Sequence, residues 1–190
     1  MVDLSDDRLA PGFLVAPPPL EDANFDRSVV LLAVHDDNGS MGFVINRESD
    51  IHLHSVFEDL ELPTDGPNQR VLAGGPVSGY AGFVLYEHEA DAPLSPGLFI
   101  SPTISVSPSR DVLEAASRGE LVGRFDLLLG YAGWGPGQLE DEMERGFWLH
   151  AGFEEELLFD TLLDERWDES YRRLGIHPSG FISVPGGAKA

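Results

Sequence analysis

Two apolar runs separated by a short polar turn limit the folds that this chain can adopt. The runs cover residues 28–34 and 41–46, and Asn38-Gly39 lies between them. Asn-Gly accepts the positive φ angles of a tight turn, so residues 28–46 are predicted to form a β-hairpin. Strands joined by a hairpin are antiparallel, which excludes a wholly parallel sheet.

Further strands and helices are predicted along the rest of the chain. β-Branched and apolar runs predict strands over residues 12–16, 70–73, 82–86, 98–106, 125–129 and 181–184. A capping box over residues 55–58 predicts one helix, and Ser107-Pro108 predicts the start of a second that ends near Gly119. A third is predicted over 137–145.

The last predicted helix has the clearest pattern. Leu163, Trp167, Tyr171 and Leu174 recur at spacings of four, four and three, which places them on one helical stripe. Seven or eight strands and four helices make one mixed α/β or α+β domain. We expect it to span residues 1–190, with an ordered core over about 11–186.

The charge is strongly negative. Twelve Lys and Arg stand against 33 Asp and Glu, a net charge of −21, and there is no cysteine. Phosphate backbones repel such a surface, so no direct nucleic-acid partner is expected. The charge fits a solvated acidic surface or an acidic patch for a basic partner. The acidic N-terminus and the lack of a long apolar run predict a cytoplasmic protein without a membrane partner.

A glycine-rich stretch over residues 130–138 is the most unusual segment. It follows a predicted strand and opens a predicted helix, the setting in which backbone N–H groups bind phosphate. Alternatively, it is a tight turn that lets Trp134 pack onto the domain, or a surface for a ligand or partner. Gly133, Trp134 and Gln138 are its candidate binding residues.

A second candidate group lies at the open end of the predicted hairpin. Arg27 precedes its first strand, and Asn46 ends its second. Arg and Asn side chains placed together bind an anion or fix a neighbouring loop through hydrogen bonds. Both alternatives stay open.

No catalytic set stands out. There is no Gly-x-Ser-x-Gly motif, and the pair His52 and His54 lacks a third ligand at a diagnostic spacing. We therefore predict no catalytic residue, metal or cofactor, and favour a protein that is not an enzyme.

Several motifs resemble one bacterial family. They are Phe25-Asp26-Arg27-Ser28, His35, Asn38-Gly39, Gly42, Asn46, Gly74-Gly75-Pro76-Val77, residues 130–140, Trp148, Trp167 and Leu174-Gly175. Together they resemble the AlgH/YqgE family of uncharacterised bacterial proteins over residues 11–186. The resemblance implies a compact, cytoplasmic domain with a mixed, strongly curved or barrel-like sheet. Members of the family have also been described as transcriptional regulators. A redox role suggested for members with cysteine does not apply to this chain, because it contains no cysteine.

These observations favour a non-enzymatic binding or regulatory protein that contacts a macromolecule or small ligand, as yet unknown. Its predicted surface combines the loop around Trp134 with the ends of the hairpin. The alternative is a nucleotide- or anion-binding protein or enzyme that uses residues 130–138, and direct transcriptional regulation ranks below both. The oligomeric state is left open.

Overall fold

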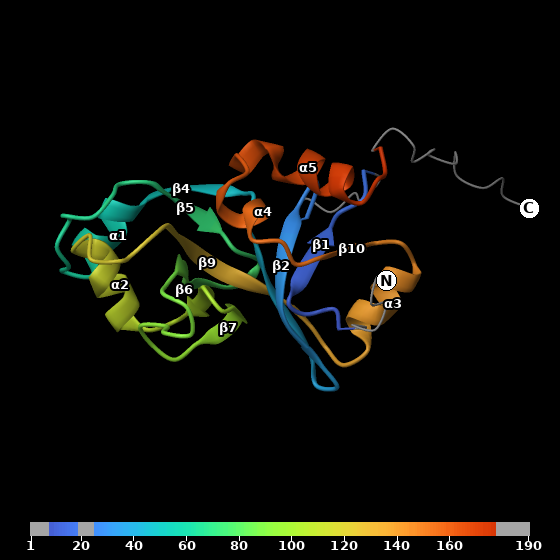
Figure 1. Ribbon diagram of the computed structural model, residues 1–190, viewed down its shortest axis with the longest axis horizontal. Coiled ribbons are helices and arrows are strands. Elements are labelled where there is room, and N and C mark those ends of the chain that lie inside the picture. Colours follow the sequence, from blue (N-terminus) through green and yellow to red (C-terminus); the bar gives the residue numbers. More distant parts are fainter. Residues whose placement is uncertain (1–7, 19–24, 178–190) are drawn as a thin grey trace, which may run out of the picture.

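A strongly curled, half-barrel sheet forms the centre of the fold (Figure 1). The computed structural model describes residues 8–18 and 25–177. In this part of the chain the strands are β1 (Gly12–Val15), β2 (Val29–Asp36), β3 (Gly39–Val44), β4 (Glu48–His52), β5 (Arg70–Ala73), β6 (Val77–Glu87), β7 (Leu98–Ser101), β8 (Ile104–Ser107), β9 (Phe125–Trp134) and β10 (Leu149–Gly152).

Helices cover the curled sheet and complete a mixed α+β fold. Over the described residues they are α1 (Leu53–Asp59), α2 (Arg110–Ser117), α3 (Gln138–Glu144), α4 (Glu156–Phe159) and α5 (Arg166–Arg173), with a 3-10 turn, η1 (Leu163–Glu165). About four helices were expected, and the short α4 is the addition. Helices α1 and α2 lie together at one end of the molecule, and α3 lies at the other (Figure 1).

Strand β9 is the junction of the sheet. Its last residues pair with β3, its middle pairs in parallel with β5, and its other edge pairs with β6. The longest path through the sheet runs β10-β1-β2-β3-β9-β6-β8-β7. The predicted hairpin is confirmed as β2 and β3, and the parallel pairing of β5 with β9 makes the sheet mixed.

The core forms three clusters of apolar side chains. Trp167 of α5 packs in the first, Leu139 of α3 in the second, and Phe57 of α1 with Val112 of α2 in the third. Each cluster lies where a helix presents its apolar stripe to the sheet, which is the arrangement that amphipathic helices favour. The stripe predicted for the last helix is confirmed, since Trp167 and Tyr171 are buried.

A buried arginine joins the C-terminal helix to the sheet. Arg166 of α5 is 5% exposed, and its guanidinium donates hydrogen bonds to the carbonyl oxygens of Ile45, Leu158 and Thr161. Burial lowers the pKa of Arg166, and attraction to Asp126 opposes that change. The pKa of Asp126 is raised by its own burial. The guanidinium thus links α4, α5 and the segment after β3.

Two predicted strands differ from the structure. The run over 98–106 is a hairpin, β7 and β8, because the chain turns at Pro102, which has no N–H to give to a ladder. The strand predicted to end at residue 129 continues to Trp134 as β9. Its glycines allow close approach there, since a Cβ on Gly130 would lie 2.4 Å from the carbonyl oxygen of Gly75.

Two predicted helix starts were wrong. Helix α1 begins at Leu53, so Ser55 lies inside it and is not its cap, and the His54 N–H donates to Asn68 Oδ1 at 3.1 Å. Helix α2 is capped by Ser109, since Ser107 remains in β8 and donates to the Pro96 carbonyl at 2.9 Å. Strands β4 and β10 were not predicted, and the predicted strand over 181–184 lies outside the described residues.

No helix within residues 8–18 and 25–177 combines the length and apolar composition needed to cross a lipid bilayer.

Candidate functional site

The residues proposed from the sequence form two groups at opposite ends of the β2–β3 hairpin. Arg27 and Asn46 meet at its open end. Gly133 and Trp134 lie at its turn, where they pair with Met41 and Ser40 of β3. The predicted surface that combined the two groups is therefore divided by the length of the hairpin.

Asn46 fixes the chain at the open end. Its Oδ1 accepts a hydrogen bond from the Val29 N–H, and its Nδ2 donates to the Arg27 carbonyl, both at 2.8 Å. Arg27 holds a left-handed backbone with φ of 51°. Both ends of the Asn46 amide are engaged with backbone, so its contacts are those of a residue that fixes a loop.

The Arg27 side chain lies on an aromatic ring. Its guanidinium carbon is 4.2 Å from the centroid of Trp167, and its Nη2 is 3.5 Å from Asp168 Oδ2. More than half of both charged side chains is exposed, so water screens this pair. A pocket of about 250 Å³ beside them is also lined by Asp26 and Asp164. Arg47 lines the same pocket, so the two arginines and the two carboxylates balance and leave no net positive charge to attract an anion.

Trp134 is packed into the fold. It is 7% exposed, and its ring meets that of Trp148 edge to face, with centroids 5.9 Å apart. Both indole N–H groups donate to Oε2 of Glu142, at 2.8 and 2.9 Å. Gln138 donates to Oε1 of the same carboxylate at 2.9 Å. The structure thus shows the packed alternative for Trp134.

The glycine-rich stretch also uses its backbone within the fold. Residues 130–134 belong to β9, and Gly133 pairs with Met41. The Gly135 N–H donates to Gln138 Oε1 at 3.0 Å. Glu140 and Asp141 occupy the first turn of α3, where negative charge would repel a phosphate. The segment is a strand followed by a tight turn that leads into α3.

Sequence reasoning missed one polar contact at the hairpin turn. Ser40 Oγ lies 2.8 Å from His35 Nδ1, and His35 Nε2 lies 3.7 Å from Glu140 Oε1. Serine, imidazole and carboxylate in this order occur in nucleophilic enzymes. Here the acid is beyond hydrogen-bond distance and Ser40 is 8% exposed. The contacts join the hairpin turn to α3.

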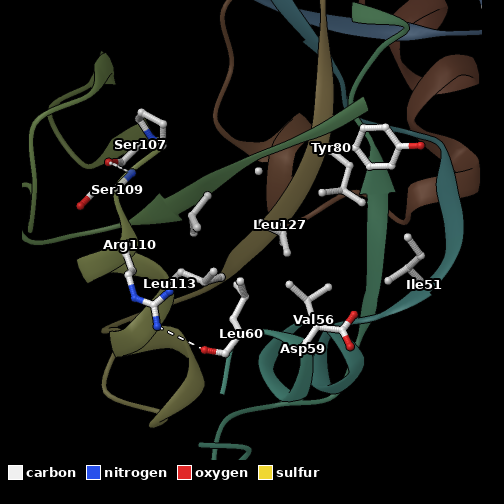
Figure 2. Close-up of a pocket in the computed structure, with 14 residues that line it drawn as sticks. Ile51, Val56, Asp59, Leu60, Tyr80, Ser107, Ser109, Arg110, Leu113 and Leu127 are labelled. Atoms are coloured by element: carbon white, nitrogen blue, oxygen red, sulfur yellow. Dashed lines mark hydrogen bonds between the residues drawn. The ribbon is translucent and has the colours of Figure 1, made fainter. Parts of the chain in front are cut away.

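An apolar hollow lies elsewhere, between α1, α2 and the sheet. It is a pocket of about 410 Å³ with a mostly apolar lining (Figure 2). The apolar lining residues include Ile51, Val56, Leu60, Leu113, Leu127 and Leu129. In Figure 2 the side chains of Leu60, Leu113 and Leu127 point toward one another. A pocket of this kind accepts apolar groups.

Polar and charged residues also line this pocket, among them Ser107, Arg110 and Asp59. Arg110 of α2 donates to the Leu60 carbonyl at 3.2 Å and pairs with Glu114 at 2.8 Å, which ties α2 to the end of α1. Asp59 is exposed on the opposite side. Tyr80 of β6 is fully exposed above the opening. The charged rim surrounds an apolar centre.

The far end of β6 is closed by an ion-pair network. Glu87 accepts hydrogen bonds from Arg124, at 2.7 Å from Nη2 and 3.1 Å from Nε, and Arg124 also pairs with Asp160. These bonds lower the pKa of Glu87 and raise the pKa of Arg124.

Over residues 8–18 and 25–177, no three His, Cys, Asp or Glu side chains are grouped so that they could hold a metal ion.

Most of the chain matches a known family. A family model described as AlgH-like matches residues 13–179, which include the hairpin, the Trp134 cluster and the pocket. The chain belongs to the AlgH-like family. The resemblance stated from the motifs is confirmed.

Relatives of the family match over nearly their whole length. A UPF0301 protein of Anaeromyxobacter dehalogenans is 40% identical, with 96% of each chain covered. Another, of Photobacterium profundum, is 39% identical, covering 93% of this chain and 97% of the relative. The solution structure of the AlgH protein from Pseudomonas aeruginosa matches with a TM-score of 0.78 and 34% identity over 99% of this chain and 100% of that one. A crystal structure from Corynebacterium diphtheriae, 24% identical, shares the fold with a TM-score of 0.66 over 86% of this chain and 85% of that one.

Proposed function

We propose that this AlgH-like protein is a non-enzymatic binding protein that holds apolar groups of a partner in the pocket between α1, α2 and the sheet. The observation that carries the proposal is the pocket itself, about 410 Å³ lined mainly by aliphatic side chains. Ile51 and Leu60 remain 41% and 38% exposed at its rim. Exposed apolar surface rimmed by polar groups is typical of binding sites.

Electrostatics indicates the kind of partner. The chain carries a net charge of −21, so it repels nucleic acid and other acidic molecules. A basic partner is attracted, which raises its association rate. We expect regulation by contact with such a partner, in the cytoplasm, in preference to direct binding of DNA.

The proposal is tested by adding a small apolar molecule to the protein. In methyl NMR spectra, millimolar indole is expected to shift the signals of Val56, Leu113 and Leu127, and to leave the Val30 methyls unchanged. Val30 is the control because it is buried in another cluster, below α3. Unchanged pocket methyls would contradict the proposal.

A pocket-filling variant gives a second test. A Cβ on Gly82 would lie 3.5 Å from Leu127 Cδ1, an ordinary contact, and Gly82 lines the pocket. Gly82→Phe is expected to fill the pocket and abolish the indole shifts, whereas Gly82→Ala retains them. Equal indole binding by both variants would show that indole binds outside this pocket and would contradict the proposal.

A further inference from the structure

Strand β8 ends opposite Val84, part-way along β6. The first half of β6 therefore has no described partner strand on that edge. Val84 pairs with Ser107, the last residue of β8, and the chain then turns into α2. On the other edge of β6, Gly82 still pairs with Leu129 of β9. Gly82 therefore lies in the sheet with β9 on one side and no described strand on the other.

The direction of the backbone groups follows from the two bonds at the end of β6. The Glu87 N–H donates toward the β9 side, to the Arg124 carbonyl, and the His88 N–H donates toward the β8 side, to the Thr103 carbonyl. N–H groups alternate between the two edges along a strand. Gly82 has the same parity as His88, so its N–H and C=O point to the edge that β8 leaves open.

The open edge borders the apolar pocket. Tyr80, Gly82 and Val84 alternate along β6, and all three line the pocket. A strand laid beside Gly82 would therefore place every second side chain over Leu113 and Leu127. Gly82 is exposed and has no side chain to obstruct that approach.

We propose that the open edge of β6 binds an extended, basic peptide segment, which adds a strand at Gly82 and places its apolar side chains in the pocket. This inference rests on the proposed function of the pocket and specifies its partner. Main-chain hydrogen bonds to Gly82 supply affinity, and alternate apolar side chains supply selectivity. Lysine or arginine at the intervening positions complements the net charge of −21.

Hydrogen exchange on the native protein tests strand addition directly. The ligand is a capped peptide of alternating lysine and valine, of about seven residues, a typical strand length. At saturation the Gly82 amide is expected to exchange at about one tenth of its rate in the free protein, or more slowly, because its N–H becomes hydrogen-bonded. Two controls are a peptide with lysines and valines in separate blocks, and an alternating peptide of glutamate and valine. Both are expected to leave the Gly82 amide unchanged.

Gly82→Pro removes the edge donor and keeps the apolar pocket. Proline is tolerated where a strand N–H faces an open edge. The variant is expected to bind the lysine–valine peptide about tenfold more weakly and to retain the indole shifts. Gly82→Ala is the matched control and binds as the parent does.

The outcomes separate this inference from the function on which it rests. Slower exchange at Gly82 with the alternating basic peptide alone supports strand addition. Unchanged exchange, or equal binding of the block peptide, while indole still shifts the pocket methyls, overturns strand addition and leaves the apolar binding function in place. Loss of both responses overturns the two proposals together. If Gly82→Pro does not fold, the exchange measurement on the parent protein decides.

Discussion

The two ends of the molecule use their aromatic residues in opposite ways. Near α3, Trp134 is 7% exposed and shares the carboxylate of Glu142 with Trp148. Near α1 and α2, Tyr80 is fully exposed above an apolar pocket. The motif-rich segment around Trp134 is thus occupied by internal contacts. The apolar pocket and the edge of β6 at Gly82, which the sequence did not predict, remain exposed.

This contrast has a physical origin. A glycine-rich strand lets several backbones and large rings come close together, and both indole N–H groups there donate to Glu142. The pocket forms because α1 and α2 cover only part of the β6 and β9 face. Distinctive residues at the Trp134 end serve packing, and the apolar pocket lies where the packing leaves side chains uncovered.

The largest expected effect sharpens the comparison between the aromatic residues. Trp134→Ala should lower the free energy of unfolding by about 3–5 kcal/mol, because it empties a buried site and removes the edge-to-face contact with Trp148. Tyr80→Ala should change it by less than about 0.5 kcal/mol, since the ring is fully exposed. Urea denaturation followed by circular dichroism measures both. Similar losses for the two variants would break the comparison.

The shared carboxylate provides the next effect. Glu142→Ala should cost about 2–3 kcal/mol, because it leaves the N–H groups of Trp134 and Trp148 without an acceptor. Glu142→Gln keeps an oxygen at this position and should cost less. Denaturation midpoints of the two variants rank them, and an equal cost would show that the indole bonds contribute little.

Two glycines extend the comparison to the backbone. Gly130 has a φ of +72°, and a Cβ there would lie 2.4 Å from the Gly75 carbonyl oxygen, so Gly130→Ala should destabilise by about 1–3 kcal/mol. Gly82→Ala meets only an ordinary contact and should be neutral or stabilise by about 0.4–1 kcal/mol. Thermal unfolding distinguishes them. A loss of stability in Gly82→Ala would mean that the pocket has no room for a methyl group beside Leu127.

The smallest effect concerns the closed end of β6. Hydrogen bonds from Arg124 lower the pKa of Glu87 in the folded state, so the ionised carboxylate stabilises the fold above its unfolded pKa of about 4.5. This contribution is lost as the pH falls below that value. Glu87→Gln should lower the free energy of unfolding at pH 7 by about 0.2–1 kcal/mol, and weaken its dependence on pH in the acid range. Denaturation at a series of pH values measures this, and parallel curves would contradict it.

Local patterns predicted much of the fold. The Asn-Gly turn gave the β2–β3 hairpin, and the spacing of Trp167 and Tyr171 gave the apolar face of α5, because both signals depend on neighbours in sequence. Strand β4 was missed because its residues are mostly exposed, so no apolar run marks it. The end of β9 was missed because glycines such as Gly130 and Gly133 favour a turn in sequence-based prediction, and the neighbouring strands that hold them in the sheet are not visible in the sequence.

The site was less predictable than the fold. Asn46 and Arg27 were expected to meet, since they flank one hairpin, and they do. The pocket was not predicted, because its lining comes from segments between Ile51 and Leu129 that no local pattern relates. The open edge at Gly82 depends on where β8 ends, and sequence reasoning had joined β7 and β8 into one strand.

The position of β9 has a consequence for synthesis of the chain. All the strands described beside it, β3, β5 and β6, come earlier in the sequence. As the polypeptide leaves the ribosome, β3, β5 and β6 therefore emerge before the strand that pairs with them. Their unpaired edges and apolar faces are exposed to mispairing and aggregation until residues 125–134 emerge. The need for chaperone binding is therefore greatest before β9 is synthesised.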